Sequence, residues 1–251
     1  MKKSPEQIKM EPVIEVRGLK KSFNGEAILN GVDLKLMKGE NLVIIGKSGS
    51  GKSVLIKCLV RLIEPEEGSM KVLDQDITKL EGRNLNEYRR NVGFLFQGGA
   101  LYDSMTVRQN LMFPLKRSVK KMNKEEMEER VHEMLKNVKL EDAIDKWPGE
   151  LSGGMKNRIA LARTLVLQPR IIFYDEPTSG LDALTSKEIS NLIVEMQENH
   201  QVSSVIITHD ISCVKITSNR INILKEGTIV DEGTYEEMSN REDPWINAFF
   251  K

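Results

Sequence analysis

The residues best suited to chemistry form one glycine-rich segment, Gly46-Lys47-Ser48-Gly49-Ser50-Gly51-Lys52-Ser53. This segment fits the pattern G-x-x-x-x-G-K-[ST] of phosphate-binding loops, which follow a strand and open a helix. Its glycines let successive backbone N–H groups point at phosphate oxygens, and the start of a helix adds a partial positive charge. Lys52 is expected to bridge the β- and γ-phosphates, and the Ser53 hydroxyl to ligate Mg²⁺. The alternative, a glycine-rich turn that matches by chance, is disfavoured by the strand and helix expected on either side.

Two carboxylates, Asp175 and Glu176, follow the apolar run 171–174. A strand buried on both faces delivers its last residues to the carboxyl edge of the sheet, where ligands bind. Asp175 is expected to hold Mg²⁺ through its water shell, and Glu176 to orient or deprotonate the attacking water. Two acids after a strand can equally form a solvated turn when seen alone, and it is the phosphate-binding loop that favours catalysis.

Two further polar residues follow apolar runs in the same way. His209 comes directly after the run 205–207 and Thr208, and a neutral imidazole there could reach a γ-phosphate oxygen or the attacking water. A lone histidine at a strand end is nevertheless more often structural. Gln97 closes the apolar run 92–96 and could contact the metal or the water, which is a weak signal by itself.

A second candidate anion site lies at Leu151-Ser152-Gly153-Gly154-Met155, before a helix with apolar positions at Met155, Ile159, Ala162 and Leu165. Ser152, Gly153 and Gly154 can form a nest of N–H groups at the start of that helix. The alternative interpretation is an ordinary capped helix.

The apolar runs alternate with helical patterns, which predicts an α/β layered sheet. We expect strands at 41–45, 92–96, 171–174 and 205–207, helices at 52–63 and 186–198, and a hairpin around the turn 225–227. Two β segments, 13–16 and 28–36, are expected to be joined by a polar stretch over 20–26. Residues 99–157 read as charged helices inserted into the sheet, with an apolar core-facing stripe at Met127, Val131, Met134, Leu135 and Val138.

Composition excludes several classes of protein. Lysine and arginine number 37 and aspartate and glutamate 37, so zero formal charge gives no nucleic-acid footprint. Hydrophobic residues at 39% with 29% charged suit a soluble globular chain. No uninterrupted apolar run exceeds four residues, whereas a membrane span needs about 18, and no apolar stretch follows Met1 to suggest a secretory signal. Cys58 and Cys213 lack metal-ligand spacing and are expected to be reduced thiols.

The order of these motifs, together with Ser179-Gly180-Leu181-Asp182, resembles the nucleotide-binding ATPase subunit of ATP-binding cassette (ABC) transporters from about residue 13 to 235. The resemblance implies a RecA-like phosphate-loop NTPase core with a mainly parallel sheet and an N-terminal antiparallel β subdomain. It also implies an inserted α-helical subdomain at about 99–157. The ATP-binding domain would span 11–240, followed by an apolar tail at 241–251. Phe23 takes the place of the aromatic that stacks on adenine, where tyrosine is commoner in the family.

The resemblance also implies the cofactors and partners. ATP and Mg²⁺ would bind, the metal through Ser53, Gln97 and Asp175, with Glu176, His209 and Gln97 as catalytic residues. Two copies would pair head to tail, so that each ATP lies between one phosphate-binding loop and the other copy's Ser152-Gly153-Gly154. The helical insertion would dock on integral-membrane permease subunits through a link at Gln97, at the cytoplasmic face of the inner membrane, with no nucleic-acid partner. Met155 departs from the usual glutamine but leaves the phosphate-facing serine and glycines intact.

A narrower resemblance concerns the transported substrate. The segment 95–107, followed by Asn110 and 113–115, resembles the ATPases of Mla-type lipid transporters, and so do Leu-Ser-Gly-Gly-Met and the terminal 243–250. This implies phospholipid transport between membranes, with permease and MCE-domain lipid-binding partners. An importer of amino acids or another small solute is the alternative. A chromosome-maintenance or translation-associated ATPase is disfavoured, because the sequence lacks long heptads, a second cassette and basic extensions.

The sequence does not determine where the apolar tail packs. Trp245, Ile246, Phe249 and Phe250 form an apolar stripe on a short helix. That stripe would pack either on its own domain or on a neighbouring subunit.

Overall fold

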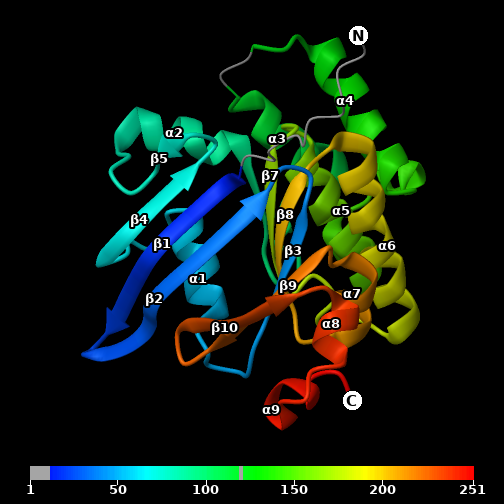
Figure 1. Cartoon of the computed structure of the whole chain (residues 1–251). Helices are drawn as coiled ribbons and strands as arrows, with labels where there is room; N and C mark the ends of the chain where they lie inside the picture. The colour runs from blue at the N-terminus through cyan, green and yellow to red at the C-terminus, as the bar shows by residue number, and fades with distance from the viewer. Residues whose placement is uncertain (1–11, 119–120) are drawn as a thin grey trace, which may run out of the picture.

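A six-stranded sheet forms the centre of the fold (Figure 1). The computed structural model describes residues 12–118 and 121–251. Strand order in this sheet is β10-β9-β3-β8-β7-β6, and every neighbouring pair is parallel except β10 with β9. The strands are β3 (Asn41–Ile45), β6 (Val92–Leu95), β7 (Ile171–Asp175), β8 (Ser203–Ile207), β9 (Arg220–Lys225) and β10 (Thr228–Gly233). The predicted α/β architecture with a mainly parallel sheet is therefore confirmed.

A second, four-stranded antiparallel sheet has the order β2-β1-β4-β5. Its strands are β1 (Pro12–Phe23), β2 (Glu26–Met37), β4 (Glu67–Val72) and β5 (Gln75–Asp76). The predicted polar connection over 20–26 is wrong, because both strands continue through it and only Asn24 and Gly25 turn the chain, at φ values of 50° and 82°. A strand with one solvated face needs apolar side chains only at alternate positions, so its polar end looks like a loop in the sequence.

The central strands carry apolar residues on both faces because both faces are buried. In β3, Leu42 and Ile44 belong to one hydrophobic core, whereas Val43 and Ile45 belong to the other. The first core lies between the two sheets and includes residues of α1 (Lys52–Leu59). That helix ends earlier than the predicted Ile63, since Arg61 adopts a positive φ of 58°.

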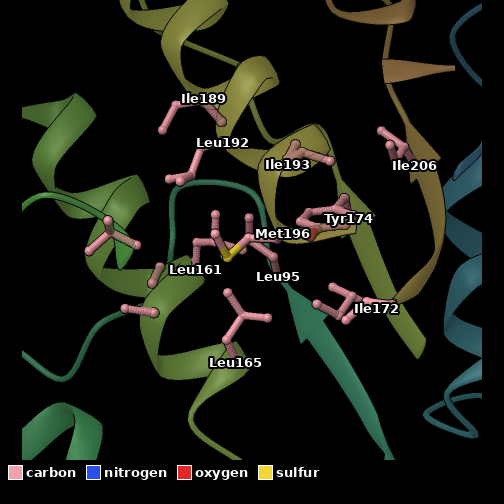
Figure 2. Close-up of a cluster of buried hydrophobic side chains, with 14 of the residues drawn as sticks. Leu95, Leu161, Leu165, Ile172, Tyr174, Ile189, Leu192, Ile193, Met196 and Ile206 are labelled. Carbon is pink, nitrogen blue, oxygen red and sulfur yellow. The ribbon is translucent and has the colours of Figure 1, made fainter. Parts of the chain in front are cut away.

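The second core fills the opposite face of the central sheet. Figure 2 shows side chains of α5 (Gly153–Leu165) and α6 (Ala183–His200) packed against residues from β6, β7 and β8. Two further helices, α3 (Val107–Lys116) and α4 (Lys124–Asn137), extend this core. The predicted stripe on α4 is confirmed, with Val131, Met134, Leu135 and Val138 buried and Met127 packed beside them.

The remaining helices are α2 (Gly82–Asn91), α7 (Ile211–Thr217), α8 (Tyr235–Ser239) and α9 (Pro244–Asn247). The apolar stripe of the tail packs on its own domain. Ile246 is buried, and Trp245, Phe249 and Phe250 lie against the second core. Among the residues described, no helix is both long and apolar enough to cross a membrane.

Both cysteines are free and buried. Burial raises the pKa of the Cys58 thiol to about 11, and that of Cys213 also to about 11. Both side chains are therefore protonated thiols at neutral pH, which agrees with the expectation of two reduced cysteines.

The core makes a direct stability prediction. Phe173 is fully buried in β7, so Phe173→Ala is expected to lower the free energy of unfolding by about 3–5 kcal/mol through lost burial and a cavity. Leu184→Ala is the control, because Leu184 is 70% exposed and a surface substitution usually changes stability by less than about 0.5 kcal/mol. Urea unfolding of both variants measures the difference. Equal losses would contradict the assignment of β7 to the core.

Candidate active site

Four neighbouring strands deliver the candidate catalytic residues to one edge of the central sheet. In the order β3-β8-β7-β6, these parallel strands end at the phosphate-binding loop, at His209, at Asp175 and Glu176, and at Gln97. Because parallel strands end at the same edge, four segments far apart in sequence meet at one cleft. The cleft has a volume of about 470 Å³ and is lined by residues from all four.

The phosphate-binding loop curls around the amine of Lys52. Lys52 Nζ donates hydrogen bonds to the carbonyl oxygens of Gly46 at 2.8 Å and Lys47 at 3.1 Å. Gly51 has a φ of 102°, and a Cβ there would lie 2.8 Å from the carbonyl oxygen of Ile28, so only glycine fits. Burial lowers the pKa of Lys52, although the nearby carboxylates Glu176 and Asp175 act in the opposite direction. The loop thus holds a partly desolvated cation at the start of α1.

Ser53 and Asp175 lie side by side in the cleft. Ser53 Oγ donates a hydrogen bond to Asp175 Oδ1 at 3.3 Å. Burial raises the pKa of Asp175, and the neighbouring Glu176 raises it further, while the Ser53 hydrogen bond lowers it. A hydroxyl and a carboxylate are the oxygen donors that Mg²⁺ prefers, and a bound cation would compensate the partly buried charge. Across the described residues no three His, Cys, Asp or Glu side chains cluster as a metal site.

Glu176 and His209 are in direct contact. Glu176 Oε2 lies 2.8 Å from His209 Nδ1 and also accepts a hydrogen bond from the His209 backbone N–H at 3.3 Å. Glu176 has a positive φ of 53°, which is strained for a residue with a side chain, and its N–H donates to the carbonyl of Ile207 at 2.9 Å. With Nδ1 engaged by Glu176, His209 Nε2 is the ring nitrogen left to reach a phosphate oxygen or a water.

Gln97 and Phe23 enter the same cleft from different sheets. Gln97 Nε2 donates to Ser179 Oγ at 3.1 Å, so Gln97 also joins the segment that follows Glu176. Phe23 ends β1 of the antiparallel sheet, and 43% of its side chain is exposed. Sequence reasoning missed Ile28 and Val54, which line the cleft with Phe23 and give it an apolar side.

The second predicted anion site, at residues 152–154, lies outside this cleft. Ser152 caps α5, where its side chain accepts a hydrogen bond from the Met155 N–H at 3.3 Å. Gly153 and Gly154 form the first turn, and a Cβ at Gly154 would lie 2.5 Å from Thr185 Cγ2. The described residues that line the cleft include none of these three. A capped helix start is therefore present, and it is separate from the loop of its own chain.

Comparison with known proteins shows which family the chain belongs to. The sequence profile of the family described as "ABC transporter" matches residues 29–179, which is more than half of the 251 residues. The chain belongs to the ABC transporter family. Its ABC cassette is 38% identical over 226 residues to the methionine import ATP-binding protein MetN of Clostridium acetobutylicum, covering 90% of this chain and 70% of MetN. It is 39% identical over 246 residues to the probable ribonucleotide transport ATP-binding protein mkl of Mycobacterium tuberculosis, covering 98% of this chain and 68% of mkl.

Solved ABC cassettes share the fold. The cassette MJ0796, in a dimeric post-hydrolysis state bound to ADP and Pi, superposes with a TM-score of 0.81 at 32% identity, covering 88% of this chain and 98% of that one. The cassette cbiO1 of Clostridium perfringens, part of the transporter complex cbiONQ, superposes with a TM-score of 0.84 at 29% identity, covering 95% and 98%. The expectation that the chain is an ABC-family ATPase is confirmed.

Proposed function

We propose that this ABC ATPase binds Mg²⁺-ATP in the cleft and couples its hydrolysis to transport by membrane permease subunits. One observation carries the proposal: the ends of β3, β8, β7 and β6 bring a phosphate-binding loop, two carboxylates, a histidine and a glutamine to a single cleft. The groups that would bind the β- and γ-phosphates and act on the attacking water are then within one cleft.

Each residue has a role that follows from its contacts. Lys52 would exchange its two carbonyl partners for phosphate oxygens, because a charged acceptor binds an ammonium more strongly than a carbonyl. Glu176 would orient the attacking water and take its proton, and His209 Nε2 would face the γ-phosphate or that water. Phe23, with its exposed ring, would stack on the adenine.

Ser53 and Asp175 would hold Mg²⁺, with Gln97 nearby in the cleft. The metal neutralises charge that develops on the phosphate oxygens. Burial and the adjacent Glu176 raise the pKa of Asp175, and a cation at this position would act in the opposite direction by stabilising the carboxylate.

A second copy of the chain would complete each site. Residues 152–154 lie at the N-terminus of α5 and do not line the cleft of their own chain, so they would face another copy's nucleotide. The dimer of the cassette MJ0796 supports such pairing.

The permease would dock beside Gln97. The segment 98–106 connects Gln97 to α3. Buried Asn110 fixes it through side-chain hydrogen bonds to the backbone of Tyr102, Met105 and Thr106. Next to it, the Tyr102 ring is 44% exposed and lies 4.8 Å from the Phe113 ring. A rigid segment that presents an exposed aromatic and leads directly to Gln97 can transmit movement between a permease and the catalytic cleft. This location would place the chain peripherally at the cytoplasmic face of the inner membrane.

Phospholipid is the proposed cargo, moved between membranes with an MCE-domain protein as a further partner. The support is the Mla-like sequence at 95–107 and in the terminal 243–250. A small solute is the second candidate, because MetN and mkl are named for methionine import and ribonucleotide transport.

Capture of the chain from detergent-solubilised membranes of its own organism tests the partners and the cargo. We expect a multi-span permease together with an MCE-domain protein, and stimulation of ATP hydrolysis by phospholipid in the reconstituted complex. A permease with a soluble solute-binding protein would overturn the lipid proposal and favour a small solute. Tyr102→Ala should weaken capture of the permease, whereas Leu62→Ala, 52% exposed but outside the helical segment, should not.

A further inference from the structure

The outer side of the phosphate-binding loop, away from the nucleotide cleft, is covered by two other parts of the chain. A Cβ at Gly46 would lie 2.3 Å from the carbonyl oxygen of Leu224, so the end of β9 already touches the start of the loop. Beside this contact, loop residues 47–50, the end of β9 and Trp245 of α9 line a small hollow of about 230 Å³. The last helix of the fold therefore reaches the loop that would hold the phosphates.

Two ammonium groups lie over the ring of Trp245. Lys225 Nζ is 4.6 Å from the ring centroid, and Lys47 Nζ, which belongs to the loop, is 5.8 Å away. Both distances fall within the range of cation–π attraction. The ring is half-buried, and it is the one aromatic side chain among those that line the hollow.

Contacts within its own segment and with β10 fix the position of Trp245. The Asp243 side chain caps α9 by accepting from the Trp245 N–H at 2.8 Å, and the ring of Phe249 meets the indole edge to face at 5.0 Å. Arg241, just before the helix, donates to both carboxylate oxygens of Asp231 on β10 at 2.9 and 3.0 Å. The indole thus belongs to an anchored segment, so that it can support the loop beside it.

One polar atom of the phosphate-binding loop is buried and unpaired among the described residues. Ser50 Oγ is buried without a hydrogen-bond partner among the described protein atoms. An unsatisfied buried hydroxyl destabilises the conformation that contains it, and favourable contacts of the loop with its surroundings offset that cost. The cations of Lys47 and Lys225 on the indole ring are such contacts.

We propose that Trp245 is a positioning residue for nucleotide binding, which holds the phosphate-binding loop in its binding conformation through Lys47 and the end of β9. A loop that is already ordered does not lose further conformational freedom when the phosphates arrive, so the ring raises affinity without touching the nucleotide. The proposal rests on the nucleotide-binding function proposed above.

Calorimetric binding of ATP and ADP to the full chain tests this role. Trp245→Ala is expected to weaken binding of both nucleotides about five- to tenfold, which corresponds to loss of two cation–π contacts. Trp245→Phe keeps a ring and should recover most of the affinity. Phe250→Ala is the matched control, because its ring packs on Tyr235 at 5.5 Å and not on the loop. It should lower the melting temperature but leave the dissociation constants unchanged.

Fluorescence provides a second measurement that needs no change at Trp245. The chain has two tryptophans, so Trp147→Phe leaves Trp245 as the single reporter. Saturating ADP is expected to shift its emission, because the bound phosphates bring negative charge close to a ring that stays in contact with Lys47. The shift should disappear in Trp147→Phe/Lys52→Ala.

Three outcomes would overturn the positioning role: unchanged affinity in Trp245→Ala, an equal loss of affinity in Phe250→Ala, or no emission change at a nucleotide concentration that calorimetry shows to be saturating. If the unmodified chain binds no nucleotide at all, the proposed function fails as well, which distinguishes the two failures.

Discussion

Glu176→Gln is expected to bind ATP as tightly as the unmodified chain and to hydrolyse it about 10²- to 10⁴-fold more slowly, the usual contribution of a general base. The amide keeps the size of the side chain and can still contact His209 Nδ1, which lies 2.8 Å from Glu176 Oε2. It cannot accept the proton of the attacking water. Equilibrium binding and steady-state hydrolysis, measured on the same preparation, separate the two effects.

Lys52→Ala is the matched comparison for this variant. Lys52 Nζ lies among the loop carbonyls at 2.8 and 3.1 Å, so its loss leaves the β- and γ-phosphate charge without a partner. ATP affinity and turnover should then fall together. An equal loss of ATP binding in Glu176→Gln and Lys52→Ala would contradict the role given to Glu176.

Mixing Lys52→Ala chains with Ser152→Arg chains is expected to restore an activity that neither variant has alone. In a head-to-tail pair, both lesions fall on the same composite site, and the other site combines an intact loop with an intact residue 152. Ser152→Arg should leave the cleft of its own chain unblocked, because Ser152 is absent from the described lining of that cleft. ATP-driven pairing should therefore return in the mixture, together with some hydrolysis if one working site suffices.

Light scattering measures this pairing when Glu176→Gln is added to both chains to retain ATP. Each variant alone is the control, at the same total concentration. If each site were self-contained, every subunit in the mixture would stay defective. No ATP-dependent gain in the mixture would count against the shared site.

Local sequence determined most of the chemistry. The loop at 46–53 is recognisable because its chemistry depends on backbone freedom and on one lysine and one serine at fixed spacing. The central strands are recognisable because burial on both faces requires continuous apolar residues, as in β3 and β8. The helical stripe on α4 is recognisable because a 3.6-residue period puts its apolar residues on one face.

Elements with weak local patterns were not predictable. Some antiparallel strands expose one face to solvent: β4, β5 and the polar ends of β1 and β2. Polar residues are allowed on such a face, so these segments have the same composition as loops. Helix α2 buries only Tyr88 among its ten residues, which leaves no apolar stripe to detect. For these segments, pairing with a neighbour determines the structure, and that neighbour is distant in sequence.

Tertiary structure alone decided how the chemical groups meet. Glu176 touches His209, Gln97 touches Ser179, and Ser53 touches Asp175 because the parallel strands that precede them end at one edge of the sheet. From the sequence, the apolar tail could pack on its own domain or on a neighbouring subunit. In the structure it packs on its own domain, with Trp245 beside the phosphate-binding loop. Sequence specifies which side chains are present and how each segment prefers to fold. Which of them come into contact depends on packing free energy summed over the whole domain, and no local pattern contains that sum.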